Sequence, residues 1–132
     1  MFESIEFKTT QKNEMVEVQK EIKTFIQKSG VLHGIIVITV PHTTAAITLS
    51  KNYDEGVQND VMVEMEELVP REGKYTHIEG NSSANVKASL FGNSVTLIID
   101  DGRLELGMFQ SVFLCEFDGP RKRKLFMKII KG

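Results

Sequence analysis

The 132-residue sequence contains a single cysteine, no marked excess of either charge, and no apolar run long enough to span a membrane. Because Cys115 is alone, no internal disulfide can form, which favours a reducing compartment. A net charge of -2 argues against a nucleic-acid partner, which requires a basic face. Without a signal peptide at Met1 or a membrane-length apolar run, we expect a cytoplasmic protein that does not bind membranes.

The sequence also lacks several motifs that would announce a function. It has no metal-finger spacing, nucleotide-cradling glycine loop, Walker motif or nucleophile elbow. It has no internal repeat, linker or low-complexity tract. What is present is typical of a soluble globular protein, with 41% hydrophobic and 26% charged residues. We therefore expect one domain covering residues 1–132, large enough to bury roughly two-thirds of its unfolded surface.

Hydrophobic periodicity predicts an α+β fold. Apolar residues at helical spacing begin at Met15 and end before Gly30, and further helices are predicted at residues 57–68 and 83–90. The predicted strands span residues 4–10, 34–40, 45–49, 94–99, 108–117 and 125–130. This order favours a mainly antiparallel β-sheet or sandwich with about three helices packed on one side. The dipeptide Asp101-Gly102 is typical of a hairpin turn with positive φ.

The predicted strand at residues 108–117 is apolar on both faces. This pattern predicts a central position in its sheet, and it requires either a second sheet layer or a partner subunit to cover the surplus apolar surface. Gln110 and Glu116 interrupt the apolar pattern. Buried polar groups of this kind need hydrogen-bond partners. Packing alone therefore does not explain why these two polar residues occur in the strand.

A turn over residues 118–120 follows that strand and leads into the basic run Arg121–Lys124. We interpret the run as a solvated face, because clusters of like charge usually face water. Arg121 differs, because the preceding turn fixes where its guanidinium leaves the backbone. That guanidinium suits Glu116, Asp118 or a ligand phosphate.

His42 is the first candidate for chemistry. It follows the strand-ending Pro41 and precedes Thr43 and Thr44, so its imidazole is expected at a strand end that a ligand could approach. An imidazole that titrates near neutrality suits a general acid or base. A structural histidine, hydrogen-bonded in a bend, is an equally open interpretation.

His77 lies in a polar loop that ends at a predicted helix N-terminus. Ser82 or Ser83 can cap that helix, and its free backbone N–H groups and partial positive charge suit a phosphate or carboxylate. An ordinary surface loop is the alternative interpretation.

Polar side chains also gather around the start of the helix predicted at residues 57–68. They are Asn52, Asp54, Glu55 and Asp60. Acids at this position either favour the positive end of the helix dipole or contribute to a catalytic or metal site.

Three segments resemble the YjbQ family: HTTAAITLSKNYDEG, YTHIEGNSSANVKASLFGNSVTLIIDDGRLELG and FQSVFLCEFDGPRKRK. The likeness covers almost the whole chain from Gly34, and its most specific part is the signature at residues 116–121. The resemblance implies a compact α+β domain that assembles as a homotrimer. It also implies the activity of a secondary thiamine-phosphate synthase, which joins a pyrimidine pyrophosphate to a thiazole phosphate with loss of pyrophosphate.

The resemblance makes His42, His77 and Asp60 the candidate catalytic residues. The candidate substrate-binding residues are Thr43, Thr44, Asn52, Asn81, Ser82, Ser83, Asn85, Gln110, Glu116, Asp118 and Arg121.

The sequence departs from the family pattern at three positions. Ser83 and Asn85 stand where the family commonly has an aspartate and a histidine, and Phe109 replaces the tryptophan of a Trp-Gln pair. Two histidines and an amide form a weak divalent-metal site. No cofactor is therefore firmly implied, although a divalent metal such as Mg²⁺ or Zn²⁺ stays open.

Three functions stay open at this point. The chain is an enzyme of the family's kind, a non-catalytic trimeric binding protein for a small phosphorylated or anionic metabolite, or a scaffold subunit whose polar pocket is vestigial. The first two require the imidazoles of His42 and His77 and the guanidinium of Arg121 to meet at one water-accessible hollow.

Overall fold

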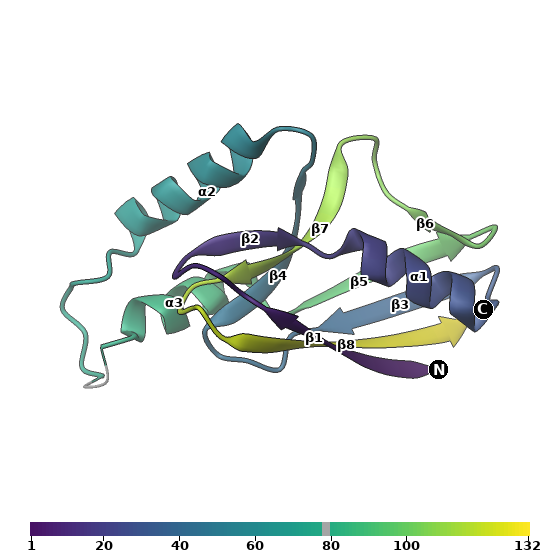
Figure 1. Ribbon diagram of the computed structural model, residues 1–132, viewed down its shortest axis with the longest axis horizontal. Coiled ribbons are helices and arrows are strands. Elements are labelled where there is room, and N and C mark those ends of the chain that lie inside the picture. The colour runs from purple at the N-terminus through teal and green to yellow at the C-terminus, as the bar shows by residue number, and fades with distance from the viewer. Residues whose placement is uncertain (78–79) are drawn as a thin grey trace.

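The computed structural model describes residues 1–77 and 80–132, and within these ranges the chain forms eight strands and three helices (Figure 1). Their bounds in chain order are β1 Phe2–Lys8, β2 Glu14–Glu17, α1 Gln19–Ser29, β3 Gly34–Thr39, β4 Ala45–Lys51, α2 Glu55–Leu68, α3 Ser82–Phe91, β5 Ser94–Asp100, β6 Arg103–Glu105, β7 Gln110–Glu116 and β8 Lys122–Lys131. Among these described residues, no helix is long and apolar enough to cross a membrane.

The described strands form two antiparallel sheets, which confirms the predicted α+β class. The larger sheet has the order β1-β8-β3-β5-β6, and the smaller has the order β2-β7-β4. Alternation along each strand decides its buried face: Ile36 and Ile38 of β3 point into the same core as Leu125 and Met127 of β8. The smaller sheet is the second layer that the surplus apolar surface predicts.

β7 is the central strand of the smaller sheet, as its two apolar faces predict. Val112 and Leu114 belong to the main core, which also receives the apolar stripe of α1. Cys115 and Phe117 belong to a second cluster, where they pack against Ala84 and other residues of α3. α1 and α3 are therefore held by opposite faces of β7, whereas α2 stands further out from the sheets (Figure 1). The prediction that the helices pack on one side is wrong, because both faces of β7 are apolar and each receives a helix.

The predicted helix from Met15 begins too early. Residues Glu14–Glu17 form β2, which pairs with β7 in a register that places Met15 opposite Cys115. The helix itself starts at Gln19, after Val18. Met15 and Val18 are three residues apart, which fits a helical stripe, but Val18 is buried in the main core whereas the partly buried Met15 packs against the second cluster. Pairing to a central strand decides the conformation of this short segment.

The hairpin predicted at Asp101-Gly102 is present, with φ values of 51° and 72° at the two residues. Its second strand, however, is β6, which pairs with β5, and not the strand that the sequence places there. After β6 the chain leaves the larger sheet and enters the smaller one as β7. The hairpin turn therefore joins two strands of one sheet, and residues 106–109 make the crossing.

Candidate functional site

A hollow of about 560 Å³ lies at the N-terminus of α3. Its walls come from the β3–β4 connection, the α2–α3 connection and the first turn of α3. The residues that line it are Thr43, Lys74, Tyr75, Thr76, His77, Asn81, Ser82, Asn85 and Val86. We call it the α3 hollow.

A second hollow of about 420 Å³ adjoins the first. It is lined by His42, Ala45, Ala88, Ser89, Gly92 and Asn93, together with Thr43 and Asn85 of the α3 hollow. We call it the His42 hollow. Because the two hollows share Thr43 and Asn85, His42 and His77 line adjoining cavities and not one common cavity, and Arg121 lines neither of them. The expectation that all three side chains meet at one hollow is therefore wrong, and any ligand site has to be argued from the residues that line each hollow.

The N-terminus of α3 is built in a way that leaves its first turn available. Gly80 has a φ of 81°, which a glycine adopts readily, and the chain then enters the helix at Asn81. In the described part of the chain, the side chain of Asn81 makes no capping hydrogen bond. Ser82 is nine-tenths buried at the wall of the hollow, and its Oγ has no hydrogen-bond partner among the described residues.

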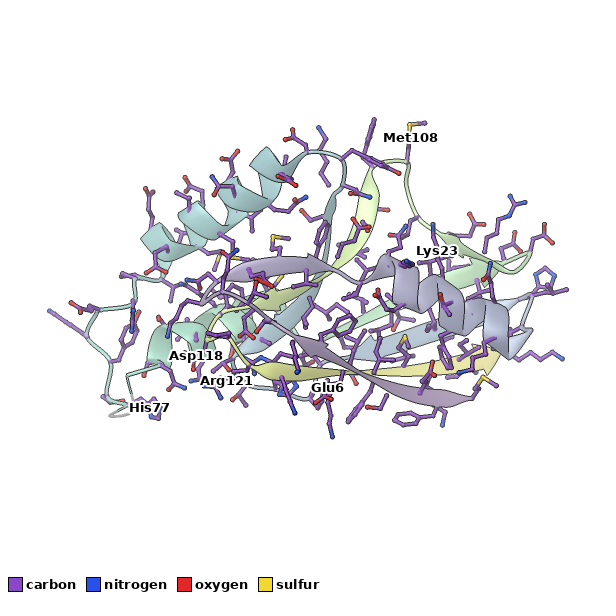
Figure 2. All side chains as sticks on the ribbon, viewed as in Figure 1. Glu6, Lys23, His77, Met108, Asp118 and Arg121 are labelled. Atoms are coloured by element: carbon purple, nitrogen blue, oxygen red, sulfur yellow. The ribbon has the colours of Figure 1, made fainter. Side chains whose placement is uncertain are left out.

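The side chain of Asn81 instead joins His77 to Asp118. The Nε2 atom of His77 lies 2.8 Å from Asn81 Oδ1, and Asn81 Nδ2 donates to Asp118 Oδ2 at 3.3 Å. Asp118 also receives Lys12 Nζ at 2.7 Å and Arg121 Nη2 at 2.5 Å. Figure 2 shows His77, Asp118 and Arg121 at the same end of the molecule, away from Met108 and Lys23.

These contacts keep Asp118 ionised. Burial opposes the charged form, but hydrogen bonds from Lys12, Asn81 and Arg121 outweigh it and lower the pKa of the carboxyl below its usual range. The turn that carries Asp118 lies against the β1–β2 connection, and a Cβ on Gly119 would meet the carbonyl oxygen of Gln11 at 2.3 Å. Glycine at this position is therefore what allows Lys12 to reach Asp118.

Glu116 is buried and fully engaged by the fold. Its carboxylate receives Arg123 Nη2 at 2.5 Å and Nε at 2.8 Å, Thr9 Oγ1 at 2.7 Å and the backbone N–H of Asp118 at 2.9 Å. The same guanidinium donates to Thr44 Oγ1 at 2.8 Å. Burial raises the pKa of Glu116, but the hydrogen bonds from Arg123, Asp118 and Thr9 lower it further than burial raises it.

The interpretation of residues 121–124 as a solvated face is therefore wrong for Arg123, which is 2% exposed. The reason is the alternation of β8, which places Arg123 on the buried face with Leu125 and Met127. The alternation that places Arg123 on the face of Leu125 and Met127 can be read from the sequence. The run of four basic residues nevertheless favoured an exposed position for Arg123. Lys122 and Lys124 are exposed, as predicted.

His42 accepts a hydrogen bond from the backbone N–H of Lys124, with 2.8 Å between that nitrogen and Nε2. Burial, followed by the positive charge of Arg123, lowers the pKa of His42, while Glu116 acts in the opposite direction. The imidazole is therefore neutral at neutral pH, and its proton lies on Nδ1 because Nε2 is the acceptor.

Other predicted site residues lie apart from both hollows. Asp60 is exposed on α2. Asn52 lines a separate hollow of about 430 Å³ near the start of that helix. Gln110 is the first residue of β7 and is exposed, not buried as predicted; it accepts from the backbone N–H of Gly107 at 2.8 Å. Ser83 is buried behind the first turn of α3 and does not line either hollow.

The structure adds residues that the sequence interpretation missed. Lys74, Tyr75 and Thr76 line the α3 hollow beside His77, and Tyr75 Oη donates to the carbonyl oxygen of Pro70. Lys12 pairs with Asp118 across 106 residues of chain. Nothing in the local sequence around Lys12 indicates this pairing, because it depends on how the β1–β2 connection meets the β7–β8 turn.

The described residues do not fit a divalent metal. Among them, no group of three or more His, Cys, Asp or Glu side chains lies close enough together to hold an ion. Beside His77, the hollow presents the amides of Asn81 and Asn85, which are weak ligands for zinc-like ions. We therefore derive no metal-dependent step from this geometry.

Comparisons with known proteins agree with this architecture. The UPF0047 protein of Methanocaldococcus jannaschii is 46% identical over 125 residues, which cover 95% of this chain and 91% of that protein. YugU of Bacillus subtilis, also a UPF0047 protein, is 39% identical over 131 residues, which cover 98% of this chain and 99% of that protein.

Solved structures of similar proteins have the same fold. An uncharacterised YjbQ/UPF0047 family protein of Clostridium acetobutylicum has a TM-score of 0.95 at 42% identity, covering 96% of this chain and 98% of that one. A YbjQ-like protein of unknown function from Sulfolobus solfataricus has a TM-score of 0.96 at 29% identity, covering 100% of this chain and 97% of that one. The model of the family described as UPF0047 protein YjbQ-like matches residues 3–132, and the chain belongs to this family.

Proposed function

We propose that the protein binds a small phosphorylated metabolite and holds its phosphate at the N-terminus of α3. The observation that carries the proposal is Ser82. Its hydroxyl is nine-tenths buried at the α3 hollow and has no partner in the described ranges of the chain. Burying such a group without a partner is unfavourable, so a ligand acceptor at this position would be stabilised.

Charge at the hollow supports an anionic ligand. The first turn of α3 contributes backbone N–H groups and the positive end of the helix dipole. Lys74 lines the hollow and adds a positive charge to its wall. The volume of about 560 Å³ lies within the range of small-molecule sites.

Calorimetric titration with inorganic phosphate and with pyrophosphate tests this proposal. We expect Ser82→Ala to weaken binding by about five- to tenfold, because it removes one hydrogen bond of about 1 kcal/mol to an anion. Ser111→Ala is the matched control, since Ser111 in β7 is also buried with an unpartnered Oγ but does not line either hollow. Absence of binding by the parent, or equal effects of the two substitutions, would show that the proposal is wrong.

A second candidate function is a transferase of the thiamine-phosphate synthase type. The observation that favours it is the pair of adjoining hollows, which would place two precursors on either side of Thr43 and Asn85. The thiazole nitrogen would form a bond to the pyrimidine methylene carbon as the carbon–oxygen bond to the leaving pyrophosphate breaks. Positioning of the precursors and stabilisation of the departing anion would supply the catalysis.

This candidate is tested by incubating the protein with both precursors and Mg²⁺. Thiamine phosphate is expected from the parent, and much less from His42→Ala, because that substitution removes an imidazole from the His42 hollow. If the parent forms no product above background, the transferase candidate is wrong and phosphate binding without turnover stands.

We also propose that the chain assembles as a homotrimer. Support comes from the outward face of the larger sheet, where Ile98, Ile35 and Ile130 lie side by side in the strand register. Ile98 is 60% exposed and Ile130 is 49% exposed. A row of exposed aliphatic side chains across a sheet is typical of a surface that another protein covers.

A further inference from the structure

The state of Asp118 fixes what its neighbours can do. Lys12 Nζ at 2.7 Å and Arg121 Nη2 at 2.5 Å hold the carboxyl in its charged form. An ionised carboxylate has no proton to donate and can only accept hydrogen bonds. Whatever group approaches Asp118 Oδ2 must therefore be a donor.

The group that approaches it is the side-chain amide of Asn81, 3.3 Å away. Because the carboxylate only accepts, the amide must present its NH₂ group to Asp118 and its carbonyl oxygen to the other side. That carbonyl oxygen lies 2.8 Å from Nε2 of His77. A carbonyl oxygen also only accepts, so Nε2 must carry the proton when the imidazole is neutral.

We propose that Asp118 acts through Asn81 as a positioning residue, which holds neutral His77 in the tautomer protonated at Nε2. In that tautomer Nδ1 of His77 carries no proton and can only accept a hydrogen bond.

The other imidazole at the site has the opposite arrangement. The backbone N–H of Lys124 can only donate, so Nε2 of His42 accepts and the proton of His42 lies on Nδ1. The fold thus sets the two imidazoles of the adjoining hollows in opposite tautomers. His42 offers a donor and His77 an acceptor, by two independent sets of contacts.

Nuclear magnetic resonance on protein labelled with ¹⁵N-histidine tests this inference without any ligand. The chain has three histidines, so each ring is readily assigned with its His→Gln variant. At about pH 8, where an imidazole of ordinary pKa is neutral, long-range ¹H–¹⁵N correlations report which nitrogen carries the proton. We expect a single Nε2-protonated form for His77 and an Nδ1-protonated form for His42.

The variant Asp118→Asn tests the role of Asp118. An amide at position 118 can donate or accept, so Asn81 is no longer held in one orientation and an Nδ1-protonated form of His77 should appear while His42 is unchanged. Asn81→Ala is the second variant, which removes the acceptor but leaves Asp118 and its cations in place. It should give the same mixture if Asp118→Asn fails to fold.

Protonation of His77 at Nδ1 in the parent would overturn the inference, as would an unchanged tautomer in both variants. Titration of the same sample with inorganic phosphate separates the two proposals. A fixed tautomer without phosphate binding would leave the positioning role intact and reject the phosphate site. Phosphate binding without a fixed tautomer would do the reverse.

Discussion

At the scale of single residues, the clearest feature is the buried pair of Glu116 and Arg123, which are 0% and 2% exposed. Each group satisfies the other, and Thr9 and Thr44 complete the hydrogen bonding. Taking two charges out of water is unfavourable, so such a pair is stable only while it is intact. The pair ties β7 of the smaller sheet to β8 of the larger one.

Replacing one member of this pair should be severe. Glu116→Gln leaves the Arg123 guanidinium buried without a compensating charge, and we expect a loss of about 3–5 kcal/mol in the free energy of unfolding. Replacing both residues together by apolar ones, as in Glu116→Leu with Arg123→Met, should be less costly than the single change. Urea unfolding measures both, with Glu6→Gln on exposed β1 as the control. If the double variant is less stable than Glu116→Gln, this account is wrong.

His42 should make stability depend on pH. Its pKa is lowered in the folded protein, chiefly by burial, whereas in the unfolded chain it returns to about 6.5. Below that value the unfolded state binds a proton that the folded state does not, so folding loses stability as the pH falls.

Urea midpoints measured between about pH 7 and pH 5 should therefore decrease toward the acid end. The slope should be reduced in His42→Asn, which lacks the titrating ring. Equal slopes in the parent and His42→Asn would contradict the assignment.

At the scale of elements, α2 and α3 are joined by an ion pair of unequal burial. Lys87 of α3 is 3% exposed, and its Nζ lies 2.5 Å from Oε2 of Glu66 on α2, whose side chain is 46% exposed. Removing Glu66 leaves a buried ammonium group, whereas removing Lys87 leaves a carboxylate that water can reach.

We therefore expect Glu66→Ala to destabilise the fold more than Lys87→Met. The loss should fall somewhat below the roughly 3–5 kcal/mol typical of a fully buried pair, because Glu66 is half-exposed. Thermal unfolding of both variants gives the order, and Glu64→Ala on the same helix is the control for removing an exposed acid. The reverse order would show that Lys87 contributes mainly by packing.

The elements also show what the sequence could predict. α1 follows from the helical spacing of its apolar residues, and β3 follows from a continuous run rich in β-branched residues, so each is largely decided by its own sequence. β2 and β6 have 4 and 3 residues, too few for a period to show, and they exist because a neighbouring strand pairs with them.

The candidate site likewise has some features that its local sequence predicts and others that depend on long-range contacts. The proposed phosphate site at the start of α3 is local. The helix-start pattern placed the N-terminus near Ser82 and Ser83, but the N-cap is Asn81 and its side chain makes no capping hydrogen bond. The bonds of Asp118 to Lys12 and Asn81 join residues 106 and 37 positions apart. No local pattern encodes them, since they depend on where three connections meet in the folded chain.

At the scale of the whole molecule, the proposed homotrimer makes a direct prediction. Placing a charge in the aliphatic row of the larger sheet, as in Ile98→Glu, should shift the molecular mass in solution from three chains toward one, because a buried unpaired carboxylate opposes association. Light scattering after size exclusion measures this shift. Thr24→Glu, on the exposed face of α1, is the control and should leave the assembly unchanged. A parent protein that is monomeric at all concentrations would contradict the trimer.

β7 is hydrogen-bonded along both edges, to β2 and β4, and covered on both faces. Amides of such a strand exchange with solvent only when the entire domain opens. Ala84 and Ala88 pack α3 against this strand. The part of the α3 hollow that α3 forms should therefore also open rarely. The α3 side of the hollow would therefore be preformed before a ligand binds. Any conformational change on binding would involve residues 74–77, which line the hollow outside α3.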